Sequence, residues 1–244
     1  MGDREDFEAL RSAHLAALAG DAGLRDASTE VYRRADVHGF SYVWDWLGMP
    51  VIQTPTDIVV LQEIVWRTRP QLVVETGVAR GGSVVLFASL LELVGEGEVV
   101  GVDVDIRAHN RAAIDAHPMR HRITLVEGSS TDGDVVEEVR RRCGTVDRVM
   151  VVLDSDHTSA HVEAELAAYA DLVTPGQYLV VADTVVEHLP VQSHRPRAWG
   201  PGDNPATALA AFLGRDDRFV VDAEIDAKLL LSSSPRGYLR RVER

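Results

Sequence analysis

The stretch from Val73 to Ser83 constrains this chain most. It reads Val-Val-Glu-Thr-Gly-Val-Ala-Arg-Gly-Gly-Ser, an apolar β-branched run, an acid, a glycine-bearing segment and then a helical run. This order predicts a strand, a tight turn and a helix. Because glycine has no Cβ, the backbone N–H groups and the positive end of the helix can approach a ligand closely. A tight turn without a ligand is the alternative.

The glycine spacing separates two classes of ligand. Gly77, Gly81 and Gly82 do not follow the G-x-G-x-x-G pattern of dinucleotide-binding turns. Glu75, at the end of the strand, is poorly placed against a pyrophosphate but suits a ligand with a cationic amine. We therefore expect this turn to bind S-adenosylmethionine rather than NAD.

Strands and helices alternate after Pro70. Apolar runs at 72–74, 98–103, 123–126, 148–153 and 178–182 predict five strands, and runs at 83–94, 134–142, 159–172 and 205–213 predict helices. Two late strands, 219–225 and 228–231, have a short connection and predict an antiparallel pair. The pattern indicates an α/β, doubly wound, mostly parallel sheet with an antiparallel last strand. Ligands in such sheets bind beyond the carboxyl ends of the strands.

The segment before this pattern is an added N-terminal element. Helices are expected at 6–20 and 29–37, so residues 1–50 form a helical or cap segment and 51–244 the ligand-binding domain. These helices could cover the open end of the sheet, pair subunits or cap the substrate. Tyr42, Trp44 and Trp46 form either a packed aromatic loop or a wall of the ligand site. Thr54 and Pro55 predict the start of a helix.

Composition excludes several classes of protein. The chain has 244 residues, a net charge of −13 and one cysteine, Cys143. The acidic balance argues against nucleic acid, and a lone cysteine excludes a disulfide framework or a thiolate metal site. No run approaches the ~18 apolar residues of a membrane helix, and the charged N-terminus does not resemble a signal peptide. We expect a soluble cytoplasmic protein.

Acidic residues follow four of the predicted strands. Asp103 ends the second strand and could accept both hydroxyls of a ribose, which needs the paired acceptors of a carboxylate. Ser129 and Ser130, after the third strand, suit an adenine edge. Asp154 and Asp183 end the fourth and fifth strands.

These carboxylates predict a cation. Each of Asp154 and Asp183 alone could cap a helix, but several carboxylates at one edge repel one another unless a cation compensates. Oxygen ligands from Asp154, Asp156 and Asp183 suit Mg²⁺. His157 could be a general base near neutral pH or could cap a helix. His188 and His194 are alternative bases.

These residues resemble a known family. Glu75-Thr76-Gly77 with Gly81-Gly82-Ser83, and then Gly101-Val102-Asp103, look like the cofactor half of a class I S-adenosylmethionine-dependent methyltransferase. The resemblance is narrower to the group labelled cephalosporin hydroxylase. It extends from about Trp46 to the C-terminus and is carried by the segments 127–130, 153–158, 161–162, 165–166, 182–187, 204–205 and 235–239.

The resemblance implies a seven-stranded Rossmann-like fold and methyl transfer to a hydroxyl, usually with Mg²⁺. The cofactor would be held by the turn and the strand ends, namely Glu75, Gly77, Val78, Gly81, Ser83, Asp103, Ser129, Ser130 and Asp154. The metal ligands would be Asp156 and Asp183 with Asp154 close by, and the candidate catalytic residues are His157, Asp156, Asp183 and His188. Metal-dependent relatives often carry an acid where this chain has Ala182, so the metal site could be weaker, could use Asp154 or Thr184 instead, or could be empty.

The expected acceptor is a small hydroxylated molecule, first a sugar and second a cephem-type natural product. The polar segment 187–204, with His194, Arg195, Arg197 and Trp199, is expected to border it, the arginines favouring an anionic group such as a diphosphate. A solvated loop is the alternative for that segment. We expect a homo-oligomer. A cofactor-binding subunit without catalysis is the competing class of function.

Overall fold

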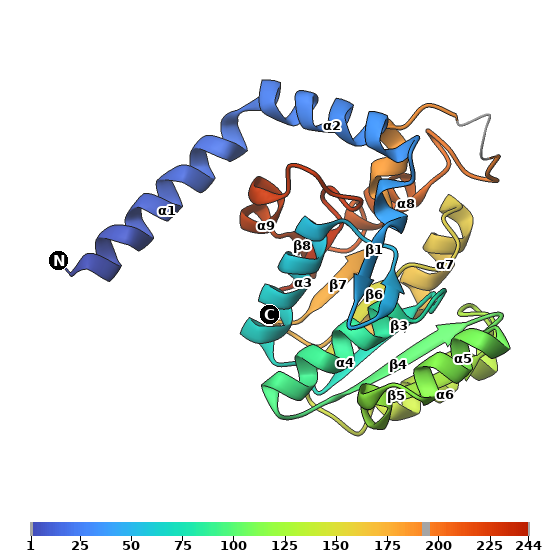
Figure 1. The fold of residues 1–244 in the computed structure, drawn as a ribbon. Coiled ribbons are helices and arrows are strands. Elements are labelled where there is room, and N and C mark those ends of the chain that lie inside the picture. The colour runs from blue at the N-terminus through green and yellow to red at the C-terminus, as the bar shows by residue number, and fades with distance from the viewer. Residues whose placement is uncertain (1, 192–195, 244) are drawn as a thin grey trace.

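The structure is a computed structural model that describes residues 2–191 and 196–243. Its body is a seven-stranded sheet covered by helices (Figure 1). Across the sheet the strands are β5 (Ile123–Glu127), β4 (Glu98–Asp103), β3 (Leu72–Thr76), β6 (Val149–Leu153), β7 (Tyr178–Val181), β9 (Tyr238–Arg241) and β8 (Phe219–Val221). Neighbours from β5 to β7 are parallel, whereas β9 is antiparallel to both β7 and β8. The predicted α/β fold class is confirmed.

Helices cover both faces of this sheet. One face packs on α3 (Pro55–Thr68), α4 (Gly82–Val94), α5 (Ala108–Asp115) and α9 (Ala223–Lys228), and the other on α6 (Gly133–Cys143), α7 (Ser159–Tyr169) and α8 (Pro205–Leu213). The central strands β3, β6 and β7 are buried along their whole length. A parallel strand buried on both faces needs a continuous apolar run, which is the pattern these segments show. The sheet edge at their carboxyl ends is therefore a rigid platform.

The last strand lies elsewhere than the sequence predicted. Residues 228–231 are not a strand, and 219–225 is a strand only to Val221. The carboxylate of Asp222 accepts hydrogen bonds from the backbone N–H groups of Glu224 and Ile225, and this N-cap starts α9. The antiparallel partner of β8 is instead Tyr238–Arg241.

The aromatic segment forms a small hairpin. β1 (Trp44–Trp46) pairs antiparallel with β2 (Met49–Val51), and the connecting Leu47 and Gly48 have φ of 48° and 83°. Trp46 donates from Nε1 to Ser89 Oγ of α4 at 2.9 Å, so this ring packs on the body. Tyr42, just before the hairpin, lines cavities at the carboxyl edge of the sheet. Trp46 is thus packed on the body, and Tyr42 stays a candidate for a wall of the ligand site.

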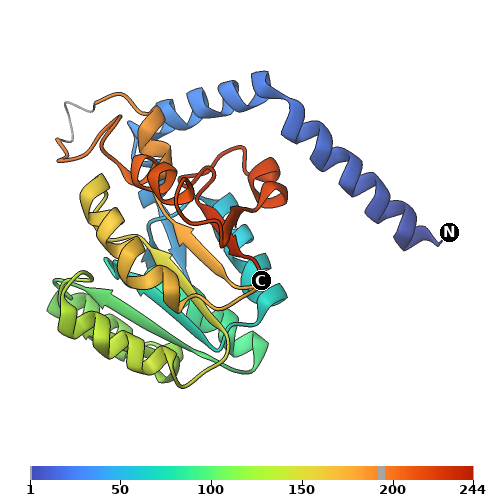
Figure 2. The same ribbon diagram turned by 180° about the vertical axis from the view of Figure 1, so that it is seen from behind.

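The N-terminal helices take two different positions. α1 (Asp3–Gly20) has no buried residue and extends away from the body in both views (Figures 1 and 2). α2 (Ala22–Asp36) starts earlier than predicted and lies over the body, and its C-terminal end is beside the segment that leads to α8 (Figure 1). None of the helices within residues 2–191 and 196–243 is long and apolar enough to cross a bilayer.

Candidate active site

The turn after β3 needs glycine at its first position. Gly77 has a φ of 94°, and a Cβ there would lie 2.0 Å from the carbonyl oxygen of Asp154. Such an approach is impossible for any other residue, so the turn packs directly on the end of β6. Gly81, with a φ of 88°, is the N-cap of α4.

Asp103 joins the end of β4 to this turn. One carboxylate oxygen accepts from the backbone N–H groups of Val78 and Ala79 at 2.9 and 3.0 Å, and the other accepts from Asp105 N–H at 3.0 Å. A carboxylate has further acceptor positions, so these bonds leave room for hydroxyl donors.

Two cavities flank the turn. The β4-side cavity, of about 360 Å³, is lined among others by Gly77, Asp103, Ser129, Ser130, Asp154 and Asp156. A smaller turn cavity, of about 140 Å³, includes Val78, Gly82, Ser83 and Asp154. Except for Glu75 and Gly81, the predicted cofactor residues therefore converge on these two cavities.

A polar network backs the wall of the β4-side cavity. His161 Nε2 lies 3.1 Å from the hydroxyl oxygens of both Ser130 and Ser155. Ser155 in turn donates to the buried carboxylate of Glu165 at 2.7 Å. The contact with Glu165 raises the pKa of His161. This pair fixes both serines where they face the cavity.

Glu75 lies beneath the turn rather than on a cavity wall. Its side chain is buried, and its Oε2 has no hydrogen-bond partner among the described residues. Burial raises the pKa of Glu75 to about 8, an effect that a hydrogen bond with Ser83 opposes. An unpaired buried carboxyl oxygen under the turn is compatible with the predicted cationic ligand.

Glu75 makes stability depend on pH. Its folded pKa of about 8 exceeds the ordinary value of 4.5, so between these values the folded protein holds a proton that the unfolded chain has lost. The free energy of unfolding must therefore fall as pH rises through this window. We expect Glu75→Gln to reduce the loss of stability between about pH 5 and about pH 8, measured by urea unfolding. An equal loss in both proteins would contradict this assignment.

Three titratable groups meet at the ends of β6 and β7. Ligand atoms of Asp154, His157 and Asp183 all lie within 4.8 Å of one another, and His157 Nε2 is 3.2 Å from the Asp183 carboxylate. Burial, followed by the charge of Asp183, raises the pKa of Asp154 well above its usual range. A divalent cation would offset this clustered negative charge, so the residues fit a metal.

The structure does not bring Asp156 into this group of three. Its carboxylate accepts from the Thr158 backbone N–H at 2.8 Å and from the Thr158 hydroxyl at 2.6 Å, next to the start of α7. It lines the β4-side cavity instead. At the neighbouring position of Asp183, Ala182 is buried and offers no ligand.

A third cavity lies on the α2 side of these groups. This α2-side cavity, of about 210 Å³, is lined among others by His157, Asp183, Tyr42, Arg197 and Trp199. The rings of His157 and Trp199 meet edge to face, with their centroids 4.9 Å apart. Arg197 lies 5.2 Å over the Trp199 ring and donates to the Tyr42 hydroxyl at 3.4 Å. His194 and Arg195 lie outside the described residues, and His188 is exposed at the end of η4 (Thr184–His188).

Several residues of this edge were missed in the sequence. Tyr32 and Asp36 are buried residues of α2 that line the α2-side cavity. Their spacing of four places them on one helix face, a signal that the sequence does carry. Gln53 donates to Asp154 Oδ2 at 3.4 Å and accepts from Ser233. No sequence pattern pointed to Gln53, because its contacts come from distant parts of the chain.

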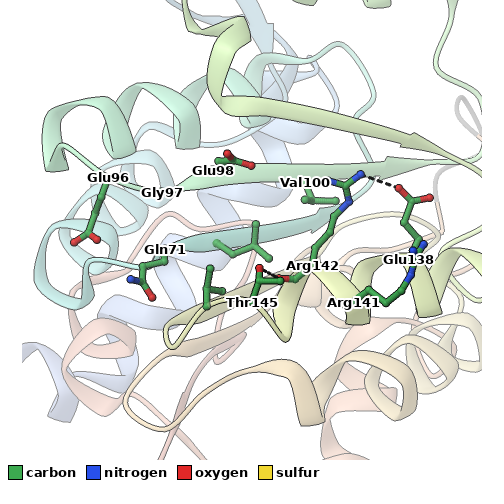
Figure 3. A pocket seen from close by; sticks show the side chains of 11 residues that line it. Gln71, Glu96, Gly97, Glu98, Val100, Glu138, Arg141, Arg142 and Thr145 are labelled. Carbon is green, nitrogen blue, oxygen red and sulfur yellow. Dashed lines mark hydrogen bonds and ion pairs between the residues drawn. The ribbon is translucent and has the colours of Figure 1, made fainter.

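A larger hollow lies at the opposite end of the strands. It has a volume of about 560 Å³ and is lined by Gln71, Glu98, Glu138, Arg142 and their neighbours (Figure 3). Arg142 pairs with Glu138 at 3.0 Å, so this charge is matched within the chain. The hollow contains neither the glycine turn nor the acids of the strand ends, and we do not assign the chemistry to it.

Comparison with known proteins identifies the family. The family model described as Rhamnosyl O-methyltransferase/CmcI matches residues 38–242. The chain belongs to this family. The rhamnosyl O-methyltransferase of Mycobacterium tuberculosis (strain ATCC 25618 / H37Rv) is 32% identical over 203 residues, covering 80% of this chain and 77% of that protein. The protein of that name from Mycobacterium leprae is 31% identical over 177 residues, 70% and 72% of the two chains.

Solved structures agree with the fold. An apo structure of CmcI superposes with a TM-score of 0.59 at 23% identity, covering 83% of this chain and 78% of that one. A CmcI structure whose description names Mg and SAM gives 0.56 at the same identity and coverage. This member of the rhamnosyl O-methyltransferase/CmcI family is thus an S-adenosylmethionine-dependent O-methyltransferase, as the family resemblance implied.

Proposed function

We propose that the chain is a Mg²⁺-assisted O-methyltransferase that methylates a hydroxyl of a sugar, either free, nucleotide-linked or part of a glycosylated natural product. One observation carries the proposal. Asp154, His157 and Asp183 stand at the junction of two cavities, Asp154 on the β4-side cavity and His157 with Asp183 on the α2-side cavity. Two reactants held on either side would meet at these side chains.

The β4-side cavity is the proposed cofactor site. The turn at Gly77, the carboxylate of Asp103 and the serine pair Ser129 and Ser130 supply backbone and side-chain partners for a nucleoside. Glu75 is buried below the turn, and its carboxyl oxygen without a partner among the described residues is compatible with a cationic group in the ligand above it. When bound, S-adenosylmethionine supplies an electrophilic methyl group.

Asp154 and Asp183 are the proposed metal ligands. Mg²⁺ prefers oxygen donors, and these two residues provide the carboxylates of the group. The ion would supply Lewis acidity that lowers the pKa of an acceptor hydroxyl. His157, oriented by its 3.2 Å contact with Asp183, is then the group that takes the proton of the hydroxyl.

Relatives support a sugar as the acceptor. The mycobacterial relatives are named rhamnosyl O-methyltransferases. The mycinamicin VI 2''-O-methyltransferase of Micromonospora griseorubida is 28% identical over 110 residues, 45% of this chain and 24% of that protein. The α2-side cavity also offers aromatic and hydrogen-bonding side chains, which suit a hydroxylated ring.

A screen with methyl-labelled cofactor tests the proposal. The panel contains nucleotide sugars, simple methyl glycosides, glycosylated natural products and sugar-free hydroxylated compounds. We expect the label as an O-methyl ether on a sugar hydroxyl. Transfer only to sugar-free acceptors would refute the substrate class, and binding of S-adenosylmethionine without transfer to any acceptor would favour a non-catalytic role.

A further inference from the structure

α2 gives the α2-side cavity an acidic wall opposite the catalytic groups. Asp36 and Tyr32 are 7% and 6% exposed, yet both line this cavity. Burial, followed by the negative charge of Asp183 and then of Asp36, raises the pKa of Tyr32. The phenol therefore stays protonated at neutral pH and lies within the electrostatic reach of both carboxylates. Asp36 and Asp183 thus face one enclosed space from two different elements.

The remaining walls are those of a sugar site. Tyr42 and Trp199 provide aromatic surface, and Arg197 is engaged with both of them. The volume of about 210 Å³ is below the ~300–1,000 Å³ of a drug-sized ligand, which favours a single ring over a whole glycoside.

We propose that Asp36 binds the hydroxyls next to the one that is methylated, so that the cavity selects a sugar ring with a free diol. A carboxylate accepts hydrogen bonds from two adjacent hydroxyls at once, and Tyr32 adds a donor beside it. The diol held by α2 orients the third hydroxyl toward His157 and Asp183. This inference rests on the proposed function for the identity of the reacting hydroxyl.

Binding to the protein saturated with S-adenosylhomocysteine tests the site without turnover. The probes are methyl α-L-rhamnopyranoside and its monodeoxy analogues, titrated by calorimetry or ligand-observed NMR. We expect Asp36→Asn to weaken the methyl glycoside by roughly 10- to 100-fold. A deoxy analogue that lacks one of the two bound hydroxyls should lose less affinity on Asp36→Asn than the methyl glycoside does, because part of the contact is already absent.

Asp26→Asn, an exposed change on the same helix, is the matched control and should bind like wild type. Equal affinity of wild type and Asp36→Asn for the methyl glycoside would overturn the inference. Asp36-dependent binding without methyl transfer would refute the proposed function but leave the role of Asp36 in binding intact. Methyl transfer that is unchanged by Asp36→Asn would refute the role of Asp36 but leave the proposed function intact.

A separate observation concerns α1, which carries a stripe of apolar side chains that the rest of the described chain covers only in part. Its C-terminal half packs against α9, where Leu15 and Leu18 are half-buried and Arg11 lies 3.7 Å from Glu224. The same stripe continues toward the N-terminus through Phe7 and Leu10, which are 62% and 53% exposed. The helix of 18 residues extends from the body as an arm (Figures 1 and 2).

In an antiparallel copy of this arm, Asp6 and Arg11 form one pair of opposite charges in each half. We infer that α1 pairs antiparallel with α1 of a second chain, with Phe7 opposite Leu10 of that copy. Asp3, Phe7, Leu10 and His14 are spaced by four, three and four residues, the period of a two-helix seam. In this register Asp3 faces His14 and Asp6 faces Arg11 of the second copy.

Light scattering after gel filtration tests the pairing. We expect wild type to be a dimer or a multiple of one, and Phe7→Glu with Leu10→Glu to halve the mass. Leu93→Glu, at a side chain that is 74% exposed on α4, should leave the mass unchanged. Asp6→Arg alone should weaken association and Asp6→Arg with Arg11→Asp should restore it. A monomeric wild type, or an unchanged mass in the double glutamate variant, would refute the pairing.

Discussion

Replacing Asp183 by asparagine is expected to lower kcat by at least ~10²-fold, or about 2.7 kcal/mol of barrier. Asn keeps the shape of the side chain but removes the charge that offsets a cation and that orients His157 Nε2 at 3.2 Å. Asp183 lines the α2-side cavity and the turn cavity but is not among the residues that line the β4-side cavity. Cofactor affinity, measured by calorimetry, should therefore stay within a few-fold of wild type.

Asp134→Asn provides the matched control. Asp134 is an exposed residue of the first turn of α6, so the same chemical change should leave kcat unaltered. A fully active Asp183→Asn would show that this carboxylate serves another purpose, and His157 would then have to act without it.

Gly77→Ala is expected to damage both folding and cofactor binding. The new Cβ would meet the Asp154 carbonyl oxygen at 2.0 Å and its carbonyl carbon at 2.6 Å, at a φ of 94°. The left-handed backbone costs about 1 kcal/mol and the displaced strand end adds ~1–3 kcal/mol. Because Asp154 also lines the β4-side cavity, we expect S-adenosylmethionine to bind at least ~10-fold more weakly.

Gly95→Ala separates the cost of the left-handed backbone from the cost of the clash with Asp154. Gly95 has a φ of 90°, but a Cβ there would meet nothing within 4 Å. It should lose about 1 kcal/mol of stability in urea unfolding and keep normal cofactor affinity. Similar losses in both variants would mean that the contact with Asp154 does not constrain the turn.

Much of this site follows from the sequence because it depends on local patterns. Buried parallel strands appear as continuous apolar runs, and the residue after each run lies at the carboxyl edge of the sheet. This rule places Asp103, Asp154 and Asp183 at one edge, and the sheet confirms the strands that carry them. The glycine spacing likewise separated this turn from a dinucleotide-binding one.

The rest depends on side-chain direction and on distant contacts. Asp154, Asp156 and His157 are nearly adjacent in sequence, so spacing could not tell which of them faces Asp183. Asp156 is turned toward Thr158. Segment 228–231 is apolar enough for a strand, but the cap at Asp222 starts a helix and Tyr238–Arg241 pairs with β7 instead. The position of α2 over the site is set by tertiary packing, which no periodicity within α2 encodes.

The most direct test of the account is methyl transfer with and without metal. The purified chain is incubated with methyl-labelled S-adenosylmethionine and the best glycoside of the screen, first in excess chelator and then with Mg²⁺ restored. The account predicts that chelation abolishes transfer to the sugar hydroxyl, that Mg²⁺ restores it, and that Asp183→Asn cannot be restored. Undiminished transfer in excess chelator would contradict the assignment of Asp154 and Asp183 as metal ligands.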